Sequence, residues 1–196
     1  MTPLDAAAAL IESLPADRRV IVGIAGAPGA GKSTFAARLA DRVGALAIPM
    51  DGFHLPQARL VELGRRERMG APDTFDVDGF VALLHALRAG GDVRAPGFER
   101  TTEEPSVGAI EIGAGDRILL IEGNYLLVWP QVPPLLDATI YLHLDHVVRH
   151  DRLIARHIAF GKTPEAARAW VLGPDEDNAR LIAAEAGRAD LALELD

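Results

Sequence analysis

Short apolar runs alternate along the chain with segments in which apolar residues recur every three or four positions. Such runs are typical of strands buried on both faces of a sheet, and the spaced segments are typical of amphipathic helices. Because helical segments separate the runs, we expect an α/β fold in which parallel strands form one sheet with helices on both faces. The expected strands are 20–25, 45–50, 117–121, 138–144 and 191–195.

Several segments between the strands carry helix signals. Asp78 precedes an amphipathic segment that ends at Gly90, so we expect Asp78 to be its N-cap. Thr163 and Pro164 are typical of a helix start, and a last helix is expected over about 175–186.

The stretch 93–116 is rich in Gly, Pro, Thr and Glu, which predicts a loop or hairpin excursion over the sheet. The chain shows no internal repeat and no segment typical of an inter-domain linker. We therefore expect a single domain over residues 1–196.

A glycine-rich turn follows the first expected strand and matches the phosphate-binding pattern G-x-x-x-x-G-K-[ST] in full. Glycines allow successive N–H groups to turn inward around phosphate oxygens, and the helix that follows presents its positive dipole end. The lysine supplies a charge to the β- and γ-phosphates, and the serine hydroxyl can ligate Mg²⁺. The predicted nucleotide-binding residues are Gly26, Ala27, Pro28, Gly29, Ala30, Gly31, Lys32, Ser33 and Thr34.

Two other interpretations of this turn compete. It can be a structural turn that binds nothing, or part of a dinucleotide-binding fold, because Asp51 lies where that fold places a ribose-binding acid after Gly31. The glycines, however, lack the G-x-G-x-x-G spacing of that fold, which does not need Lys-Ser at the helix start. We therefore predict an ATP site with Mg²⁺.

Two expected strands end in acids, at the edge where ligands bind in open α/β sheets. Asp51 can accept the proton of an attacking hydroxyl or position Mg²⁺. Glu122 ends an apolar strand as in a Walker B motif, so we expect it to act with Ser33 on the metal. Both acids also have a structural interpretation, as a turn or cap residue for Asp51 and as a hydrogen-bonding strand end for Glu122.

The segment 145–160 predicts a helix with a basic face, on which two arginines lie four positions apart and a third lies one turn earlier. Arginines that converge on a phosphoryl group can neutralise charge that develops during transfer. One alternative is a solvated face paired with Asp145 and Asp151, and another is a metal site from nearby histidines. The arginines are Arg149, Arg152 and Arg156, and the histidines are His143, His146 and His150.

Composition narrows the function further. The net charge of −8 argues against a main role in binding nucleic acid or an anionic membrane. No cysteine is present, which excludes disulfides, thiolate metal sites and a cysteine nucleophile. The apolar runs are too short to span a bilayer and the first residues lack a signal-peptide pattern, so we expect a cytoplasmic protein.

Four further motifs occur in the order and at the spacing found in one group of kinases: Met50–Pro56, Gly70–Asp76, Ala95–Phe98 and Ile121–Leu127. With them the chain resembles the phosphoribulokinase/uridine kinase superfamily, especially the bacterial type I pantothenate kinases. The segment Asp175–Leu181 is similar to a short bacterial branch of nucleoside/nucleotide or sugar-transport-associated kinases.

The resemblance implies a five-stranded parallel P-loop kinase core with a mobile, arginine-bearing lid at about 149–163. It also implies that Asp51 is the catalytic carboxylate and that Arg152 and Arg156 belong to the lid, where they act in catalysis with Lys32. The expected acceptor-binding residues are Asp51, His54, Phe98, Glu99 and Arg100.

We therefore expect a Mg-ATP-dependent kinase that phosphorylates a hydroxyl group of a small metabolite. The acceptor stays open among pantothenate, nucleosides and sugars, because pantothenate kinases have a histidine near the place of Arg100 and uridine kinases have Tyr-Asp in place of Phe98-Glu99. The alternatives are a P-loop ATPase or nucleotide switch acting on a protein partner, and a degenerate kinase kept as a subunit. We expect neither nucleic acid nor membrane as a partner, and a homodimer stays open because related kinases often dimerise.

Overall fold

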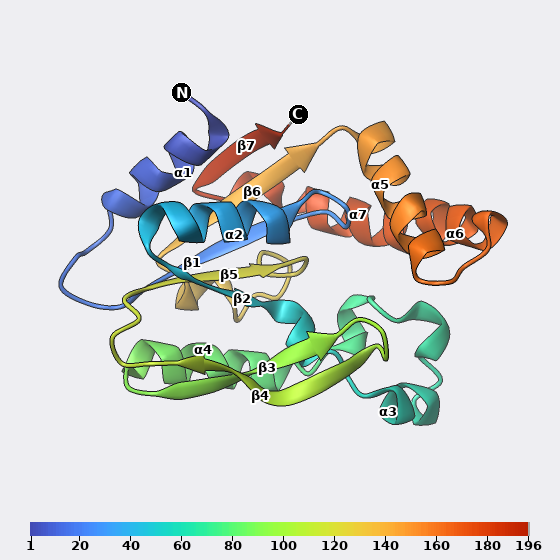
Figure 1. Ribbon diagram of the computed structural model, residues 1–196, viewed down its shortest axis with the longest axis horizontal. Coiled ribbons are helices and arrows are strands. Elements are labelled where there is room, and N and C mark those ends of the chain that lie inside the picture. Colours follow the sequence, from blue (N-terminus) through green and yellow to red (C-terminus); the bar gives the residue numbers. More distant parts are fainter. Residues whose placement is uncertain (196) are drawn as a thin grey trace.

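The computed structural model describes residues 1–195 and contains a five-stranded parallel sheet (Figure 1). Every neighbouring pair in this sheet is parallel, and the central strand is buried along its whole length. The fold and the five apolar runs are therefore as expected. In their order across the sheet, the strands are β2 (Leu46–Pro49), β5 (Ile118–Gly123), β1 (Val20–Gly26), β6 (Ala138–Leu144) and β7 (Leu191–Leu195).

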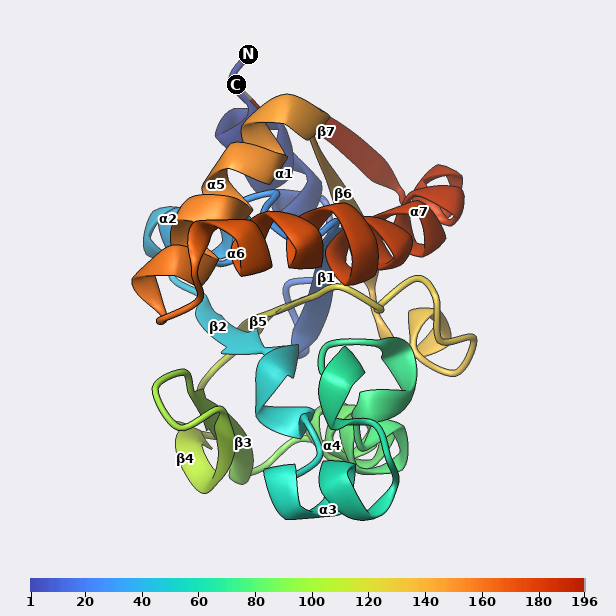
Figure 2. The ribbon, with the colours of Figure 1, turned by 90° about the vertical axis from the view of Figure 1, so that its right-hand side faces the viewer.

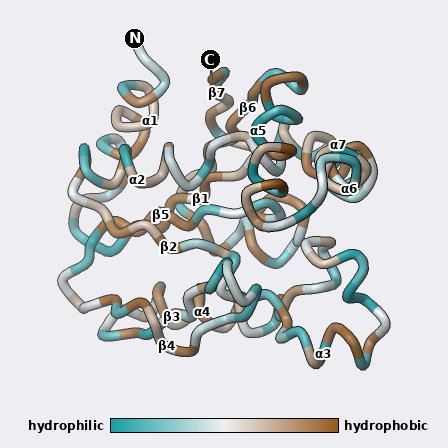
Figure 3. Tube along the Cα trace, turned by 45° about the vertical axis from the view of Figure 1, so that its right-hand side comes forward, coloured by the Kyte–Doolittle hydropathy of each residue, from teal (hydrophilic) through white to brown (hydrophobic). Residues whose placement is uncertain are grey.

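Helices cover both faces of the sheet. Successive side chains of a strand point to opposite faces, so a strand of apolar residues has two apolar faces to bury. Val22 and Ile24 of β1 pack in a cluster with α1 and α2, whereas Ile21 and Ala25 pack in a cluster with α4 and α7. Figure 3 shows the apolar stretches along β1 and β5. The helices are α1 (Pro3–Glu12), α2 (Lys32–Val43), α3 (Gln57–Glu62), α4 (Val77–Ala89), α5 (His146–Ala159), α6 (Pro164–Trp170) and α7 (Glu176–Ala184). Between residues 1 and 195, none of them has the length and apolar character of a membrane-crossing segment.

Helices α5, α6 and α7 form a helical arm after β6, and α6 runs on into α7 across the molecule (Figure 2). Asp145 caps α5, and Thr163 caps α6 as its sequence predicts. A π-helical turn, Val171–Asp175, joins α6 to α7, so the last helix is shorter at both ends than the expected 175–186.

The N-cap of α4 differs from its prediction. The Asp76 carboxylate accepts a hydrogen bond from the Gly79 backbone N–H at 2.9 Å, which makes Asp76 the cap. The prediction of Asp78 was wrong because Asp78 already lies in the first turn, where an acid stabilises the helix through its dipole. Gly90 ends the helix as expected.

The expected excursion over 93–116 is an antiparallel hairpin of β3 (Val93–Glu99) and β4 (Glu104–Ile112). It packs against the 3₁₀ turn Met50–Phe53 that follows β2. A Cβ atom on Gly52 would overlap the backbone of Pro96, so only glycine allows the turn and the hairpin to approach this closely.

We expect Gly52→Ala to lower the free energy of unfolding by about 1–3 kcal/mol, the usual cost of forcing extra atoms into a packed site. Urea unfolding followed by circular dichroism measures this cost. Gly115→Ala is the matched control, because nothing lies within 4 Å of a Cβ atom there. Equal unfolding midpoints for the two variants would contradict the close packing of turn and hairpin.

Candidate active site

The loop between β1 and α2 has the conformation that its glycines predict. Gly29 and Gly31 have φ angles of 81° and 86°, in the left-handed region that glycine adopts without strain. Gly31 is the N-cap of α2, so the first N–H groups of that helix lie at the loop. The loop and the helix start together provide the kind of surface that binds phosphate.

Lys32 begins α2 and is the central cation of the site. It is 9% exposed, and Nζ donates hydrogen bonds to the carbonyl oxygens of Gly26 (2.9 Å) and Ala27 (3.0 Å). Burial lowers the pKa of this amine to about 8, although the charges of Glu122 and Asp51 oppose the shift. The amine is thus held over the loop by acceptors that phosphate oxygens can replace.

Ser33 and Glu122 meet at the carboxyl edge of the sheet. Ser33 Oγ donates a hydrogen bond to Glu122 Oε1 at 2.8 Å, and Glu122 pairs with Ile24 of β1 in the parallel register. Glu122 is 7% exposed, and burial raises the pKa of its carboxyl group while the Lys32 charge opposes this rise.

This pair fits a magnesium ion. Mg²⁺ takes oxygen ligands and usually keeps several waters beside substrate phosphates, so a hydroxyl and a carboxylate suit it. Within the described part of the chain, no group of three or more His, Asp or Glu side chains is placed to hold a metal ion. An ion at Ser33 and Glu122 would therefore share its coordination with water and phosphate oxygens.

Asp51 lies on the 3₁₀ turn directly after β2, at the same edge of the sheet. Its side chain is 29% exposed and forms an ion pair with Arg100, whose Nη2 lies 3.2 Å from Asp51 Oδ2. Arg100 belongs to the tip that joins β3 to β4. The hairpin tip and the sheet edge therefore meet at this pair.

Aromatic rings lie next to Asp51. The His54 ring contacts those of Phe75 and Phe98, with centroid separations of 4.0 and 4.7 Å. Burial lowers the pKa of His54, although the Asp51 charge opposes the shift. Nδ1 of His54 lies 2.8 Å from the Asp51 carbonyl oxygen and donates to it. The ring thus fixes the backbone of Asp51 and gives the site an apolar wall.

A cavity of about 700 Å³ joins these groups. Gly26, Ala27 and Ala30 are not among its lining residues; the first two accept the hydrogen bonds of Lys32, and Ala30 is buried. The predicted site residues that line the cavity are Pro28, Gly29, Gly31, Lys32, Ser33, Thr34, Asp51, His54, Phe98, Arg100, Glu122, Arg152 and Arg156.

Glu99 was expected at the acceptor, but the structure does not bring it to this cavity. Its carboxylate accepts hydrogen bonds from the backbone N–H and the hydroxyl of Thr101, at 3.1 and 2.6 Å. The physical reason is the alternation of side chains along β3, where Phe98 faces the cavity and its neighbour faces away.

The polar residues of the cavity wall that were not predicted include Arg66, Asn124 and Asp175. Arg66 lies in an irregular segment, where no periodic pattern could indicate it. The other two fall within motifs that carry the family resemblance, so a signal was present without a role attached to it.

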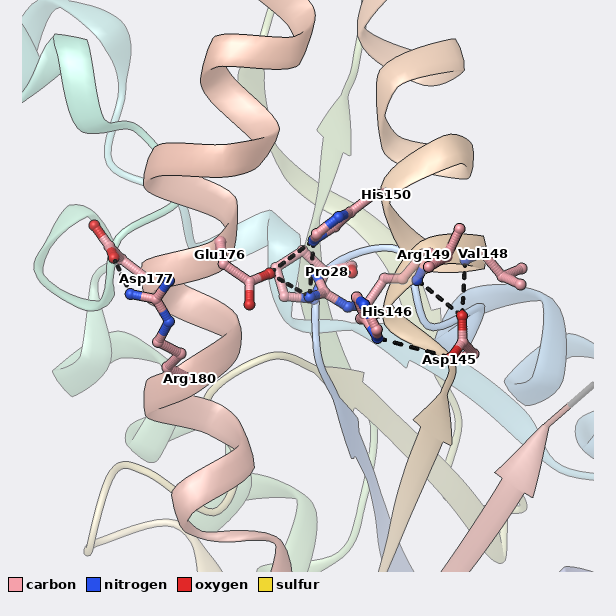
Figure 4. A network of polar contacts seen from close by, with 10 residues as sticks. Pro28, Asp145, His146, Val148, Arg149, His150, Glu176, Asp177 and Arg180 are labelled. Atoms are coloured by element: carbon pink, nitrogen blue, oxygen red, sulfur yellow. Dashed lines mark hydrogen bonds and ion pairs between the residues drawn. The ribbon is translucent and has the colours of Figure 1, made fainter.

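Arg149 does not join the other two arginines of α5 at the cavity. It lies instead among Pro28, His150 and Glu176 (Figure 4). It is 4% exposed, and its guanidinium lies 2.5 Å from Glu176 Oε2 and donates to the Pro28 carbonyl at 3.3 Å. His150 lies 2.9 Å from the same carboxylate. Arg149 therefore fastens α5 and α7 to the phosphate loop, while Arg152 and Arg156 lie further along α5 and line the cavity.

The histidines around the start of α5 take separate partners. The His143 ring packs on Tyr141 at 4.5 Å, His146 lies beside Asp145, and His150 contacts Glu176. None of them belongs to a metal-binding cluster in residues 1–195, so the structure gives no support to the histidine metal site.

Comparisons with known proteins show the family of this chain. The model of the phosphoribulokinase/uridine kinase family matches residues 21–195. A proposed uridine kinase of Schizosaccharomyces pombe is 37% identical over 168 residues, which cover 77% of this chain and 72% of that protein. The pantothenate kinase of Bacillus subtilis is 36% identical over 118 residues, 56% of this chain but only 37% of that kinase.

The same relationship appears among solved structures. A proposed fructose transport system kinase from Silicibacter sp. TM1040 superposes with a TM-score of 0.92 at 37% identity, covering 98% of this chain and 99% of that one. The five-stranded parallel sheet, the full phosphate loop and these relatives lead to one conclusion. The chain belongs to the phosphoribulokinase/uridine kinase family and is an ATP-dependent small-molecule kinase.

Proposed function

We propose that the protein transfers the γ-phosphoryl group of Mg-ATP to a hydroxyl group of a small metabolite, with Asp51 as the proton acceptor. The observation that carries this proposal is the shared cavity, in which the Asp51 carboxylate lies at the same sheet edge as Lys32, Ser33 and Glu122. A phosphate donor site and a carboxylate thus open into one space, which is what transfer to a hydroxyl needs.

At the nucleotide end, the loop N–H groups and Lys32 bind the β- and γ-phosphates. Lys32 exchanges its two carbonyl partners for phosphate oxygens, and its charge compensates theirs. Ser33 and Glu122 would hold Mg²⁺, which when bound neutralises phosphate charge.

At the acceptor end, Asp51 orients the hydroxyl and takes its proton. The acceptor oxygen forms the new bond to phosphorus while the bond between phosphorus and the ADP oxygen breaks, so the proton remains on Asp51 until it leaves to solvent. Arg152 and Arg156 line the other wall and neutralise charge on the transferred group. The helical arm covers the phosphates and excludes water that would otherwise hydrolyse ATP.

We expect Asp51→Asn to lower acceptor-dependent ADP formation by about 10²- to 10⁴-fold, the usual contribution of a general base. The measurement is ADP release from Mg-ATP with single acceptors, and mass spectrometry checks for the phosphorylated product. Asp41→Asn, an exposed acid on α2, is the control and should keep wild-type turnover.

Near-normal turnover of Asp51→Asn would refute the role of Asp51. ADP formation at an equal rate with and without acceptor would instead favour the ATPase or nucleotide-switch alternative.

The pKa of Lys32 predicts a pH dependence of nucleotide binding. The amine is charged below pH 8 and loses its proton as the pH rises through about 8, and the triphosphate then loses its main partner. We expect the Kd of Mg-ATP to rise by up to about tenfold between pH 7 and pH 9, in proportion to the lost charged fraction. Isothermal titration calorimetry measures this change.

Lys32→Arg is the control for this prediction, because a guanidinium stays charged over the whole range. Its affinity should be flat with pH, whatever its absolute value. A wild-type Kd that does not change from pH 7 to pH 9 would contradict the lowered pKa of Lys32.

A further inference from the structure

Arg100 is paired with a carboxylate that the proposed reaction needs for another purpose. Asp51 is the counter-ion of Arg100, with 3.2 Å between Arg100 Nη2 and Asp51 Oδ2. During transfer, the Asp51 carboxylate takes the proton of the acceptor hydroxyl and loses its charge, so it no longer compensates Arg100. This inference therefore rests on the proposed function, and it asks which group then compensates the Arg100 charge.

The cavity carries more positive than negative charge, although the whole chain has a net charge of −8. The acids of its lining are Asp51, Glu103, Glu122 and Asp175. The cations are Lys32, Arg66, Arg100, Arg152, Arg156 and Lys162. A surplus of cations within an acidic protein indicates a ligand that brings negative charge, and the place of each cation shows where that charge is compensated.

The nucleotide end already has its own cations. Lys32 lies on the phosphate loop, and Arg152 and Arg156 come from α5. Lys162 is on the arm and lies over the Trp170 ring, 4.5 Å from its centroid. Arg100 lies on the hairpin tip and pairs with Asp51, and Arg66 follows α3 and pairs with Glu103 of the same tip, so we assign both charges to the acceptor end.

Arg66 differs from Arg100 in its counter-ion. Arg66 Nη2 lies 2.5 Å from Glu103 Oε2, and no step of the proposed reaction requires Glu103. That pair can remain intact through catalysis. Arg100 is thus the acceptor-side cation that loses its partner when Asp51 acts as a base.

The position of Arg100 is built into the hairpin tip. Glu103 has a φ of 54°, the only non-glycine residue with a positive φ in residues 1–195, and such a conformation persists only when its surroundings enforce it. Gln57 supplies that support, because its Nε2 donates to the Thr102 and Glu103 carbonyls at 3.3 and 3.4 Å. The tip therefore holds Arg100 over Asp51 by contacts that do not involve Arg100 itself.

We propose that the acceptor carries an anionic group, a carboxylate or a phosphate ester, which binds Arg100 and thereby frees Asp51 to accept the hydroxyl proton. The guanidinium exchanges one carboxylate partner for another anion, and a bidentate anion matches its fork of donors. The exchange is easy, because the Arg100 and Asp51 side chains are 47% and 29% exposed and such pairs contribute little stability. A neutral acceptor offers no such replacement and leaves Asp51 engaged.

Matched acceptor pairs test this proposal: pantothenate with pantothenol, glycerate with glycerol, and glucose 6-phosphate with glucose. For the pair that is turned over, we expect kcat/KM of the anionic member to exceed that of the neutral member by at least about tenfold. The first two pairs and the third distinguish a carboxylate from a phosphate ester.

Arg100→Gln separates this role from a role toward the γ-phosphate. If Arg100 binds the acceptor anion, the variant raises KM for the anionic member and brings the ratio within a pair close to one. Arg94→Gln is the matched control, because Arg94 lies on the same hairpin, pairs with Glu111 and is not part of the cavity lining.

Two turnover results would overturn the proposal while leaving the kinase function intact. One is a neutral acceptor that is preferred over its anionic partner and depends on Asp51. The other is Arg100→Gln lowering kcat equally for both members of a pair. Acceptor-independent ADP formation that survives Asp51→Asn would instead be a failure of the proposed function.

Sulfate binding decides the proposal without turnover. With Mg²⁺ and β,γ-imido-ATP filling the phosphate loop, calorimetry should detect saturable sulfate binding to the wild type and to Arg94→Gln. Arg100→Gln should weaken it by at least about fivefold, since a charge-assisted contact is lost. Absence of saturable sulfate binding in the wild type, or equal affinity in Arg100→Gln, would refute the anion site.

Discussion

The site depends on a buried ammonium group. Lys32 has lost most of its hydration, and a charge in that position is stable only where other polar groups replace the water. The structure provides two loop carbonyls in direct contact and two carboxylates, Glu122 and Asp51, whose field favours the charged form. One electrostatic arrangement therefore includes three parts of the chain. They are the loop with its left-handed glycines, the acid at the end of β5 and the acid after β2.

A second buried cation links this arrangement to the helical arm. Arg149 contacts the loop carbonyl of Pro28 and the Glu176 carboxylate of α7, so the arm is docked on the glycine-rich loop. A Cβ atom on Gly29 would lie 2.8 Å from Leu153 Cγ and 2.9 Å from Arg149 Cγ. Gly29 is therefore required for two reasons: its φ angle is positive, and α5 packs directly against it. This packing holds α5 at the loop, and Arg152 and Arg156 of α5 line the cavity there.

The sequence predicted most clearly those parts that local rules determine. The five apolar runs gave the strands, and the loop pattern gave the glycine-rich turn at the start of α2. Asp51 and Glu122 line one cavity with that turn because acids that end parallel strands must meet at one edge. Arg149 was grouped with Arg152 and Arg156 because helical spacing shows which side chains share a face but not which partner buries one of them. Arg66 and the π-helical turn before α7 depend on tertiary contacts of irregular segments, and spacing along the chain carries no information on those.

The two ends of the cavity also differ in how freely a sequence can change them. At the phosphate end, Lys32, Glu122 and Arg149 are buried, and replacing one would leave the partner charge or carbonyl unsatisfied. At the acceptor end, Arg66 and Arg100 are partly exposed and form ion pairs from irregular segments, where a substitution has little effect on the fold. A substitution in the hairpin tip or in the segment after α3 therefore leaves the buried contacts of Lys32, Glu122 and Arg149 in place. The family likeness identifies the type of reaction, and under our proposal the charges around Asp51 select the acceptor.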